Sequence, residues 1–131
     1  IPAGTETDAI AATIDLLPTI ASLAEVELRT RGPIDGLDIS ELILGAVASP
    51  RDEMLFYTGQ GILSGYRQGE YKLVRAQPDK AFQLFNLKED IGEQTNLMVA
   101  LPEKAAALKA QMITLDQQLH AEARPHGTIQ P

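Results

Sequence analysis

The sequence predicts an α+β fold in which a four-stranded antiparallel sheet packs against a long carboxyl-terminal helix. Four short segments, rich in apolar and aromatic residues, follow one another at residues 54–58, 62–67, 71–75 and 82–87. The connections are short and contain turn residues such as Gly59, Gly61 and Gly69, which favours hairpins over helical crossovers. Beyond Asn96 the apolar residues recur every three or four positions, as is typical of an amphipathic helix.

The predicted long helix carries one apolar stripe. Pro102 suits its first turn, because the N–H groups there have no partner within the helix. The stripe consists of Leu101, Ala105, Leu108, Met112, Leu115 and Leu119. A stripe of this kind needs cover, so we expect it to pack on one face of the sheet.

Residues 82–97 join the last predicted strand to this helix. Leu84 and Phe85 point to opposite sides of an extended segment, so we expect that strand to be covered on both faces. Asp90 and Gly92 are predicted to shape the following turn, since Asp bonds nearby backbone groups and Gly accepts a positive φ at little cost. Asn96 is predicted to satisfy backbone groups ahead of the helix.

A shorter helix is predicted from Leu16 to about Glu25, after an extended segment at residues 10–14. Pro18 opposes a longer helix, because a proline in a helix interior costs about 3 kcal/mol or more. Pro18 is compatible with a helix that begins directly after Asp15, because it then lies in the first turn. In the N-cap position the Asp15 side chain would accept a hydrogen bond from an otherwise unpaired backbone N–H.

Composition excludes several classes of function. The net charge of −7, from 18 acidic and 11 basic residues, opposes sequence-independent binding to nucleic acid. No apolar run approaches the ~20 residues of a membrane span. Cysteine is absent, which removes disulfides, thiolate metal sites and a cysteine nucleophile. The chain starts at Ile1 without an initiator methionine or a leader, so we expect a fragment or processed product whose natural amino terminus lies elsewhere.

Several acidic residues and the two histidines could belong to a functional site, but each also has a purely structural explanation. Asp15, Asp35 and Asp38 could ligate a hard cation, but no loop has the ligand spacing of a calcium site, and turn and cap roles account for all three. His120 and His126 lie six residues apart across a proline, and neither has a partner placed for acid–base work.

The turn at residues 68–69 carries a polar and aromatic group that could touch an anionic substrate, although an exposed hairpin needs the same residues to stay in solution. The group consists of Tyr66, Arg67, Tyr71 and Lys72. No nucleophile elbow, phosphate-binding glycine loop or paired-cysteine motif is present in the sequence. The residues taken alone therefore indicate an α+β domain with no catalytic set.

Six segments, in order, resemble the carboxyl-terminal part of the sulfatase family, above all the arylsulfatases. They read IPAGT, IDLLPTIASLA, IDGLDISELILG, SPRDEMLFYTG, GYRQGEYKLV and LFNLKEDIGEQTNL. The resemblance covers nearly the whole chain. It implies a large amino-terminal α/β domain with the active site and a smaller domain with a four-stranded antiparallel sheet and a long helix. Residues 1–45 would then be the terminal piece of the catalytic domain with a connector, at the edge of an absent α/β domain, and residues 46–131 the smaller domain.

The resemblance also implies chemistry that this chain does not carry. Sulfatases use a formylglycine made from Cys or Ser in a Cys/Ser-x-Pro-x-Arg motif, with a divalent metal, usually calcium. Pro50 is no part of such a motif, because Ala48 and Asp52 stand where the motif needs Cys or Ser and Arg. No catalytic or metal residue is therefore carried over, and no cofactor is expected in this chain. The nucleophile is expected upstream of Ile1.

The expected role is support of the missing catalytic domain, with a sulfate ester as the substrate of the parent protein. Tyr57 and Gln60, at the end of the first strand, are candidates for the rim of the substrate pocket. The resemblance is compatible with a periplasmic or secreted location. Two alternatives stay open: a phosphatase or phosphonate hydrolase of the same alkaline phosphatase superfamily, and a non-enzymatic binding module. The nucleophile motif upstream of this chain would distinguish a sulfatase from a phosphatase or phosphonate hydrolase. An exposed apolar patch around residues 10–23 would argue against the binding module.

Overall fold

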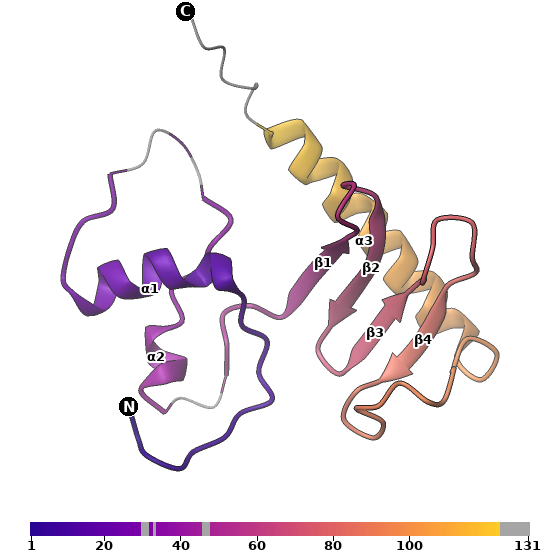
Figure 1. The fold of residues 1–131 in the computed structure, drawn as a ribbon, viewed down its shortest axis with the longest axis horizontal. Helices are drawn as coiled ribbons and strands as arrows, with labels where there is room; N and C mark the ends of the chain where they lie inside the picture. The colour runs from indigo at the N-terminus through magenta and orange to yellow at the C-terminus, as the bar shows by residue number, and fades with distance from the viewer. Residues whose placement is uncertain (30–31, 33, 46–47, 124–131) are drawn as a thin grey trace, which may run out of the picture. The chain divides into compact units, whose positions relative to one another are not determined.

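The computed structural model describes residues 1–29, 32, 34–45 and 48–123 (Figure 1). The chain forms two compact units, Ile1–Met54 and Leu55–Pro131. In the described part of the chain, no helix has both the length and the apolar character needed to cross a membrane. The assignment of residues 1–45 to an absent catalytic domain stays a prediction.

The two predicted helices and the four predicted strands are present in the expected order, together with the short elements η1 and α2. They are η1 (Thr13–Asp15), α1 (Leu16–Leu23), α2 (Ser40–Ile43), β1 (Glu53–Tyr57), β2 (Leu63–Gln68), β3 (Tyr71–Val74), β4 (Gln83–Asn86) and α3 (Pro102–Glu122). The strands form one sheet in the order β1-β2-β3-β4. Sequential neighbours are also spatial neighbours, so the predicted antiparallel meander and the α+β class are confirmed.

The antiparallel pairs β2–β3 and β3–β4 define the register of the sheet. Gln68 pairs with Tyr71 across the β2–β3 turn, and Tyr71 pairs with Asn86 on β4. Gly69 has a φ of 54° in the first of these turns, a left-handed conformation that glycine takes without a Cβ clash. Each strand end lies within one residue of its predicted position, a difference that is normal at element ends.

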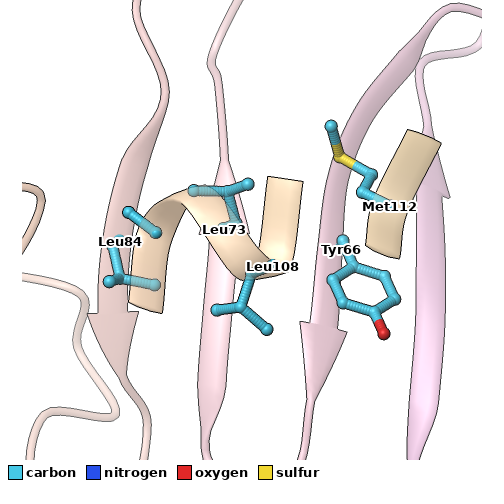
Figure 2. Close-up of a cluster of buried hydrophobic side chains, with 6 residues drawn as sticks. Tyr66, Leu73, Leu84, Leu108 and Met112 are labelled. Carbon is cyan, nitrogen blue, oxygen red and sulfur yellow. The ribbon is translucent and has the colours of Figure 1, made fainter. Parts of the chain in front are cut away.

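The core of the second unit lies between the sheet and α3 (Figure 2). Strands β2, β3 and β4 contribute one fully buried side chain each, and α3 covers them with residues one turn apart. The buried cluster consists of Tyr66, Leu73, Leu84, Ala105, Leu108 and Met112. The prediction that the helix stripe covers the sheet is therefore confirmed for the middle of α3.

The opposite face of β4 is also buried, as predicted. Phe85 is 4% exposed although its neighbour Leu84 points into the core. Lys72, the register partner of Phe85, has its ammonium 5.4 Å from the centroid of the Phe56 ring. The same ammonium lies 2.5 Å from a carboxylate oxygen of Glu93, which ties the loop after β4 to this face.

The turn after β4 differs from the prediction at one residue. Glu93 has the positive φ, 54°, so the expectation that Gly92 would take this conformation is wrong. A left-handed conformation costs a residue with a side chain roughly 1–2 kcal/mol. We attribute the observed arrangement to the ion pair with Lys72, which Gly92 has no side chain to make. The Asp90 carboxylate accepts from the N–H groups of Gln94 and Thr95, at 2.8 and 2.7 Å.

Asn96 and Leu97 close part of the outer edge of β4. The Asn96 side-chain oxygen accepts from the N–H groups of Leu84 and Met98, both at 3.1 Å. The Leu97 N–H donates to the Leu84 carbonyl at 2.7 Å. Both backbone groups of Leu84 that face outward are thereby satisfied, so the loop replaces a neighbouring strand at this point.

The first unit also departs from the prediction at its helix ends. Residues 13–14, expected to be extended, lie in η1, and α1 ends at Leu23 rather than near Glu25. Glu25 has a φ of 54°. The Val26 N–H donates to the Ala21 carbonyl and the Glu25 N–H to the Ser22 carbonyl. This pair of bonds is a Schellman motif, and it stops the helix two residues early.

Candidate functional site

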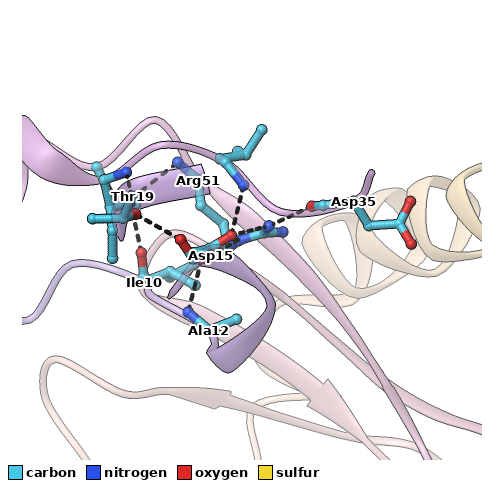
Figure 3. A network of polar contacts seen from close by, with 9 residues as sticks. Ile10, Ala12, Asp15, Thr19, Asp35 and Arg51 are labelled. Carbon is cyan, nitrogen blue, oxygen red and sulfur yellow. Dashed lines mark hydrogen bonds and ion pairs between the residues drawn. The ribbon is translucent and has the colours of Figure 1, made fainter. Parts of the chain in front are cut away.

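The most buried polar centre in the described residues is the ion pair of Asp15 and Arg51 (Figure 3). The Asp15 side chain is fully buried and the Arg51 side chain is 11% exposed. Arg51 donates from Nε to Asp15 Oδ2 at 2.9 Å and from Nη2 to Oδ1 at 2.5 Å. Two parallel charge-assisted bonds fix the relative orientation of the two planar groups.

Asp15 also holds the surrounding backbone. Its carboxylate accepts from the N–H groups of Ala12 and Leu37, both at 2.8 Å, while Arg51 Nη2 donates to the Asp35 carbonyl at 2.8 Å. The centre thus joins the segment before α1, the connector at residues 35–37 and the segment before β1. Such an arrangement orders chain segments; it leaves no carboxylate lone pair directed at a substrate.

The predicted cap role of Asp15 is therefore wrong in its details. Asp15 does precede α1, but no side-chain hydrogen bond caps that helix. Its carboxylate instead reaches back to the Ala12 N–H, from within η1, and across to Arg51. The physical reason is that the Arg51 guanidinium offers two parallel charge-assisted bonds together with an opposite charge, whereas a backbone N–H of α1 would offer one bond.

The hydrogen bonds from Arg51 hold the pKa of Asp15 at about 2, below its ordinary 3.8. Burial acts in the opposite direction, and the N–H groups of Leu37 and Ala12 reinforce the effect of Arg51. A general acid or base needs a pKa near the working pH. Asp15 is therefore an anion throughout the physiological range and serves as a structural group.

Thr19 extends the network within the first unit. Its hydroxyl donates to the Asp15 carbonyl at 2.6 Å and accepts from the Ile39 N–H at 3.0 Å. Asp38 accepts from the Ser40 N–H at 2.8 Å, at the start of α2, and a hydrogen bond with the Ser22 side chain is the main cause that lowers the pKa of Asp38. Among the residues that the structure describes, no three His, Cys, Asp or Glu side chains come together to hold a metal.

Tyr57 and Gln60, the predicted rim residues, lie at the end of β1 and in the turn that follows. Tyr57 is 40% exposed, and its hydroxyl donates to Asp116 Oδ1 on α3 at 2.7 Å. Burial, followed by this bond and the charge of Asp116, raises the pKa of Tyr57 to about 12. Gln60 is exposed, and its N–H donates to Thr58 Oγ1 at 3.3 Å. The rim role itself stays a prediction.

The residues around the 68–69 turn and the two histidines were the remaining candidates from the sequence. The residues around the 68–69 turn do not form one anion site, because Tyr66 is fully buried in the core while Lys72 faces Phe56 and Glu93 on the other side of the sheet. His120 Nδ1 lies 3.5 Å from Asp116 Oδ1, next to the bond from Tyr57. His126 lies outside the described residues.

Sequence reasoning missed the two pairings because their members are far apart in the chain. Arg51 is 36 residues from Asp15, and Tyr57 is 59 residues from Asp116. One signal was available for the first pair: an acidic residue on an otherwise apolar helix needs a cationic partner if it is buried. Nothing in the spacing indicated which cation.

The first unit presents an apolar face on α1. Leu16, Leu17, Ile20 and Leu23 are between 50% and 62% exposed. Positions separated by three or four residues share a helix face, so these side chains form one contiguous patch. Patches of this kind mark an interaction site on a folded protein.

Together, these elements define an α+β chain, and in the part that the structure describes no three His, Cys, Asp or Glu side chains gather to hold a metal. No family model matches the chain. The chain is 33% identical over 125 residues to Arylsulfatase A of Bos taurus, covering 76% of the chain and 24% of that protein. With Arylsulfatase A of Homo sapiens it shares 32% identity over 145 residues, covering 88% and 28%.

A solved structure shows the same fold. The structure, from work on the metabolism of multiple glycosaminoglycans by Bacteroides thetaiotaomicron, matches with a TM-score of 0.70 and 20% identity, over 85% of this chain and 26% of that one. The chain spans about a quarter of the length of the relatives it matches. The chain belongs to the sulfatase family and corresponds to its carboxyl-terminal portion.

Proposed function

We propose that the full-length protein is a sulfuric ester hydrolase and that this chain supports its catalytic domain without performing the reaction itself. The observation that carries the proposal is the 33% identity to an arylsulfatase along three quarters of the chain. The described residues support the second part, since the buried carboxylate of Asp15 is fully engaged by Arg51 and by backbone N–H groups.

The apolar face of α1 is the proposed contact with the catalytic domain. Burying the exposed halves of Leu16, Leu17, Ile20 and Leu23 would contribute about 1 kcal/mol for each side chain. The Asp15 network holds α1 against the connector, so this face is presented as a rigid surface. A module that is complete by itself would cover most of these side chains, so the exposed patch favours a chain that packs against a further domain.

The cofactors of the reaction are proposed to be bound outside this chain. Sulfatases in general use a formylglycine and a divalent metal, which provide the nucleophile and stabilise charge on the sulfate oxygens. The described residues do not fit either group, because no acidic cluster is available and Ala48 and Asp52 break the nucleophile motif. We propose that both lie elsewhere in the full-length protein and that the metal is calcium.

Tyr57 and Gln60 are proposed to contact the sulfate ester at the rim of the pocket. The Tyr57 hydroxyl is engaged by Asp116, so its contact with substrate would be made by the ring, whose position is held by that bond. Tyr57→Ala and Gln60→Ala are expected to raise KM more than they lower kcat. Gln77→Ala, in another exposed turn, is the matched control and should leave both unchanged.

Activity of the full-length protein tests the main proposal. Its gene should encode a Cys/Ser-x-Pro-x-Arg segment, and the purified protein should hydrolyse nitrophenyl sulfate faster than nitrophenyl phosphate. Chelation should abolish the activity and calcium should restore it. A preference for the phosphate ester would replace the sulfatase with a phosphatase of the same superfamily. Activity that survives mutation of the motif residue would contradict the proposed nucleophile.

A further inference from the structure

One nitrogen of the Arg51 guanidinium binds two different groups. Arg51 Nη2 donates to Asp15 Oδ1 at 2.5 Å and to the backbone carbonyl of Asp35 at 2.8 Å (Figure 3). The Asp35 carbonyl belongs to the peptide bond that joins Asp35 to Gly36. A buried cation therefore holds the oxygen of an Asp-Gly peptide bond, in which the side-chain carboxyl and the next backbone nitrogen can close a five-membered ring.

The two groups that would form this ring are both accessible. Asp35 is exposed, and its carboxylate points away from the polar network in Figure 3. In the described part of the chain, no donor binds this carboxylate and no acceptor binds the N–H of Gly36. The electrophilic carbon and the nucleophilic nitrogen thus lie on adjacent residues without a competing hydrogen bond.

Gly36 cannot be replaced by a bulkier residue that would hinder ring closure. A Cβ atom on Gly36 would lie 2.1 Å from the carbonyl oxygen of Ile14 and 3.2 Å from Pro18 Cδ. The first distance is far inside van der Waals contact, and the oxygen belongs to the backbone of η1, which cannot move aside as a side chain can. The close approach that requires glycine also leaves the Gly36 nitrogen without a side chain beside it.

The bond from Arg51 makes the N–H of Gly36 more acidic. The guanidinium withdraws electron density from the Asp35 carbonyl, and the nitrogen of the same amide loses density with it. When this nitrogen gives up its proton, negative charge spreads onto the carbonyl oxygen, where the charge-assisted bond becomes stronger. A hydrogen bond that strengthens in this way as the charge develops accelerates a reaction by about tenfold.

We propose that Asp35 is a site of spontaneous isomerisation to isoaspartate. The Gly36 nitrogen loses its proton and bonds to Asp35 Cγ, and an oxygen of the carboxyl group leaves as water, which gives a succinimide. Water then adds to the backbone carbonyl carbon of residue 35, the bond from that carbon to nitrogen breaks, and the nitrogen takes up a proton. The mass is unchanged, and the backbone now runs through the former side chain. This inference stands independently of the proposed hydrolase activity.

The product changes the surroundings of Arg51. In isoaspartate the former backbone carbonyl of residue 35 is a carboxylate, so Nη2 faces this new anion in addition to Asp15. The backbone before Gly36 is also one methylene longer, which displaces the Leu37 N–H from its 2.8 Å bond with Asp15. The modification therefore weakens the polar centre that orders the first unit.

The test follows isoaspartate formation in the full-length protein, incubated at neutral pH in water labelled with heavy oxygen. Mass spectrometry of the digested protein measures the heavy oxygen that enters residue 35 when the succinimide is hydrolysed. The reference is a synthetic peptide of residues 32–40, which contains the same Asp-Gly pair without Arg51. Conversion should be about tenfold faster in the folded protein than in the peptide. Asp38 is the internal control and should stay unconverted, because the N–H of the next residue, Ile39, is bound by Thr19.

Two variants separate activation by Arg51 from simple exposure of the segment. Arg51→Met should convert no faster than the peptide, whereas Arg29→Met, which removes a surface cation of the same unit, should convert like the wild type. Conversion in the wild type that is equal to or slower than in the peptide would overturn the proposal. Fast conversion in Arg51→Met would exclude activation by the guanidinium.

Hydrogen exchange tests the effect on the polar centre. In the converted fraction the Leu37 amide should exchange about tenfold faster than in the unconverted fraction, because its bond to Asp15 is lost. Asp35→Glu, incubated in parallel, should show no conversion and no change in exchange, since its longer side chain would have to close a larger ring. Equal exchange in the two fractions of the wild type would refute the assigned consequence.

Discussion

Replacement of Arg51 by Met tests the buried ion pair most directly. Met keeps much of the aliphatic stem of Arg and removes the guanidinium, so Asp15 retains only the N–H bonds from Ala12 and Leu37. Removing one partner of a buried ion pair costs about 3–5 kcal/mol, because the other charge stays buried without compensation. We expect Arg51→Met to lower the free energy of unfolding of the first unit by about 3 kcal/mol at neutral pH.

The pH dependence gives this prediction a second signature. The pKa of Asp15 is about 2 in the folded protein and ordinarily 3.8. A carboxyl whose pKa is lowered by folding adds stability above the unfolded value, and that stability disappears as the pH falls toward the folded value. The full contribution is about 2.5 kcal/mol, roughly half of which is lost at about pH 3. The deficit of Arg51→Met should therefore shrink by about 1 kcal/mol between about pH 6 and pH 3.

Hydrogen exchange of the Leu37 amide is the appropriate assay, because this N–H donates directly to Asp15 and reports local opening of the first unit. Arg29→Met is the control, since Arg29 pairs with Glu27 on the surface with 89% of its side chain exposed. Leu37 exchange within twofold of wild type at pH 7 would refute the assigned role of the pair. So would a deficit that is as large at pH 3 as at pH 6.

Three further predictions concern the second unit. Leu108→Ala should destabilise it by about 2–5 kcal/mol through lost burial and a cavity, whereas Ile113→Ala, at a position 43% exposed, should cost far less; chemical denaturation compares them, and equal losses would contradict the packing described. Removal of residues 102–131 should unfold the sheet, because α3 covers its apolar face; a cooperative unfolding transition in the truncated protein would show otherwise. Tyr57 should ionise only near pH 12 in an ultraviolet titration, and Asp116→Asn should bring its pKa down; an unchanged midpoint would exclude Asp116 as a cause.

The elements of the second unit could be predicted because their signals are local. The glycine-containing turns and the period of α3 lie within short windows of sequence, and the structure confirms the meander and its cover. Asp90 and Asn96 likewise act on residues close by in the chain, apart from the bond of Asn96 to Leu84. The positive φ predicted for Gly92 was wrong, because Glu93 takes this conformation while its side chain pairs with Lys72, 21 residues earlier in the chain.

The polar centres could not be predicted, because each depends on residues brought together only by the fold. Asp15 has the sequence context of a helix cap, and its actual role depends on Arg51, 36 residues further on. Tyr57 was singled out by its place at the end of a strand, while its partner Asp116 lies near the other end of the chain. Local sequence indicates which roles such residues can take, and contacts with residues far away in the sequence determine which role is observed.

The position of α3 in the chain has a consequence for synthesis. Leu84 closes the sheet, but the side chains that cover it, Ala105, Leu108 and Met112, are translated some twenty to thirty residues later. A ribosome therefore exposes a complete set of strands with one uncovered apolar face before the helix emerges. During that interval the nascent sheet is a substrate for chaperones and for association with other chains. Arrival of α3 ends this interval, so the second unit should fold in a single late step rather than strand by strand.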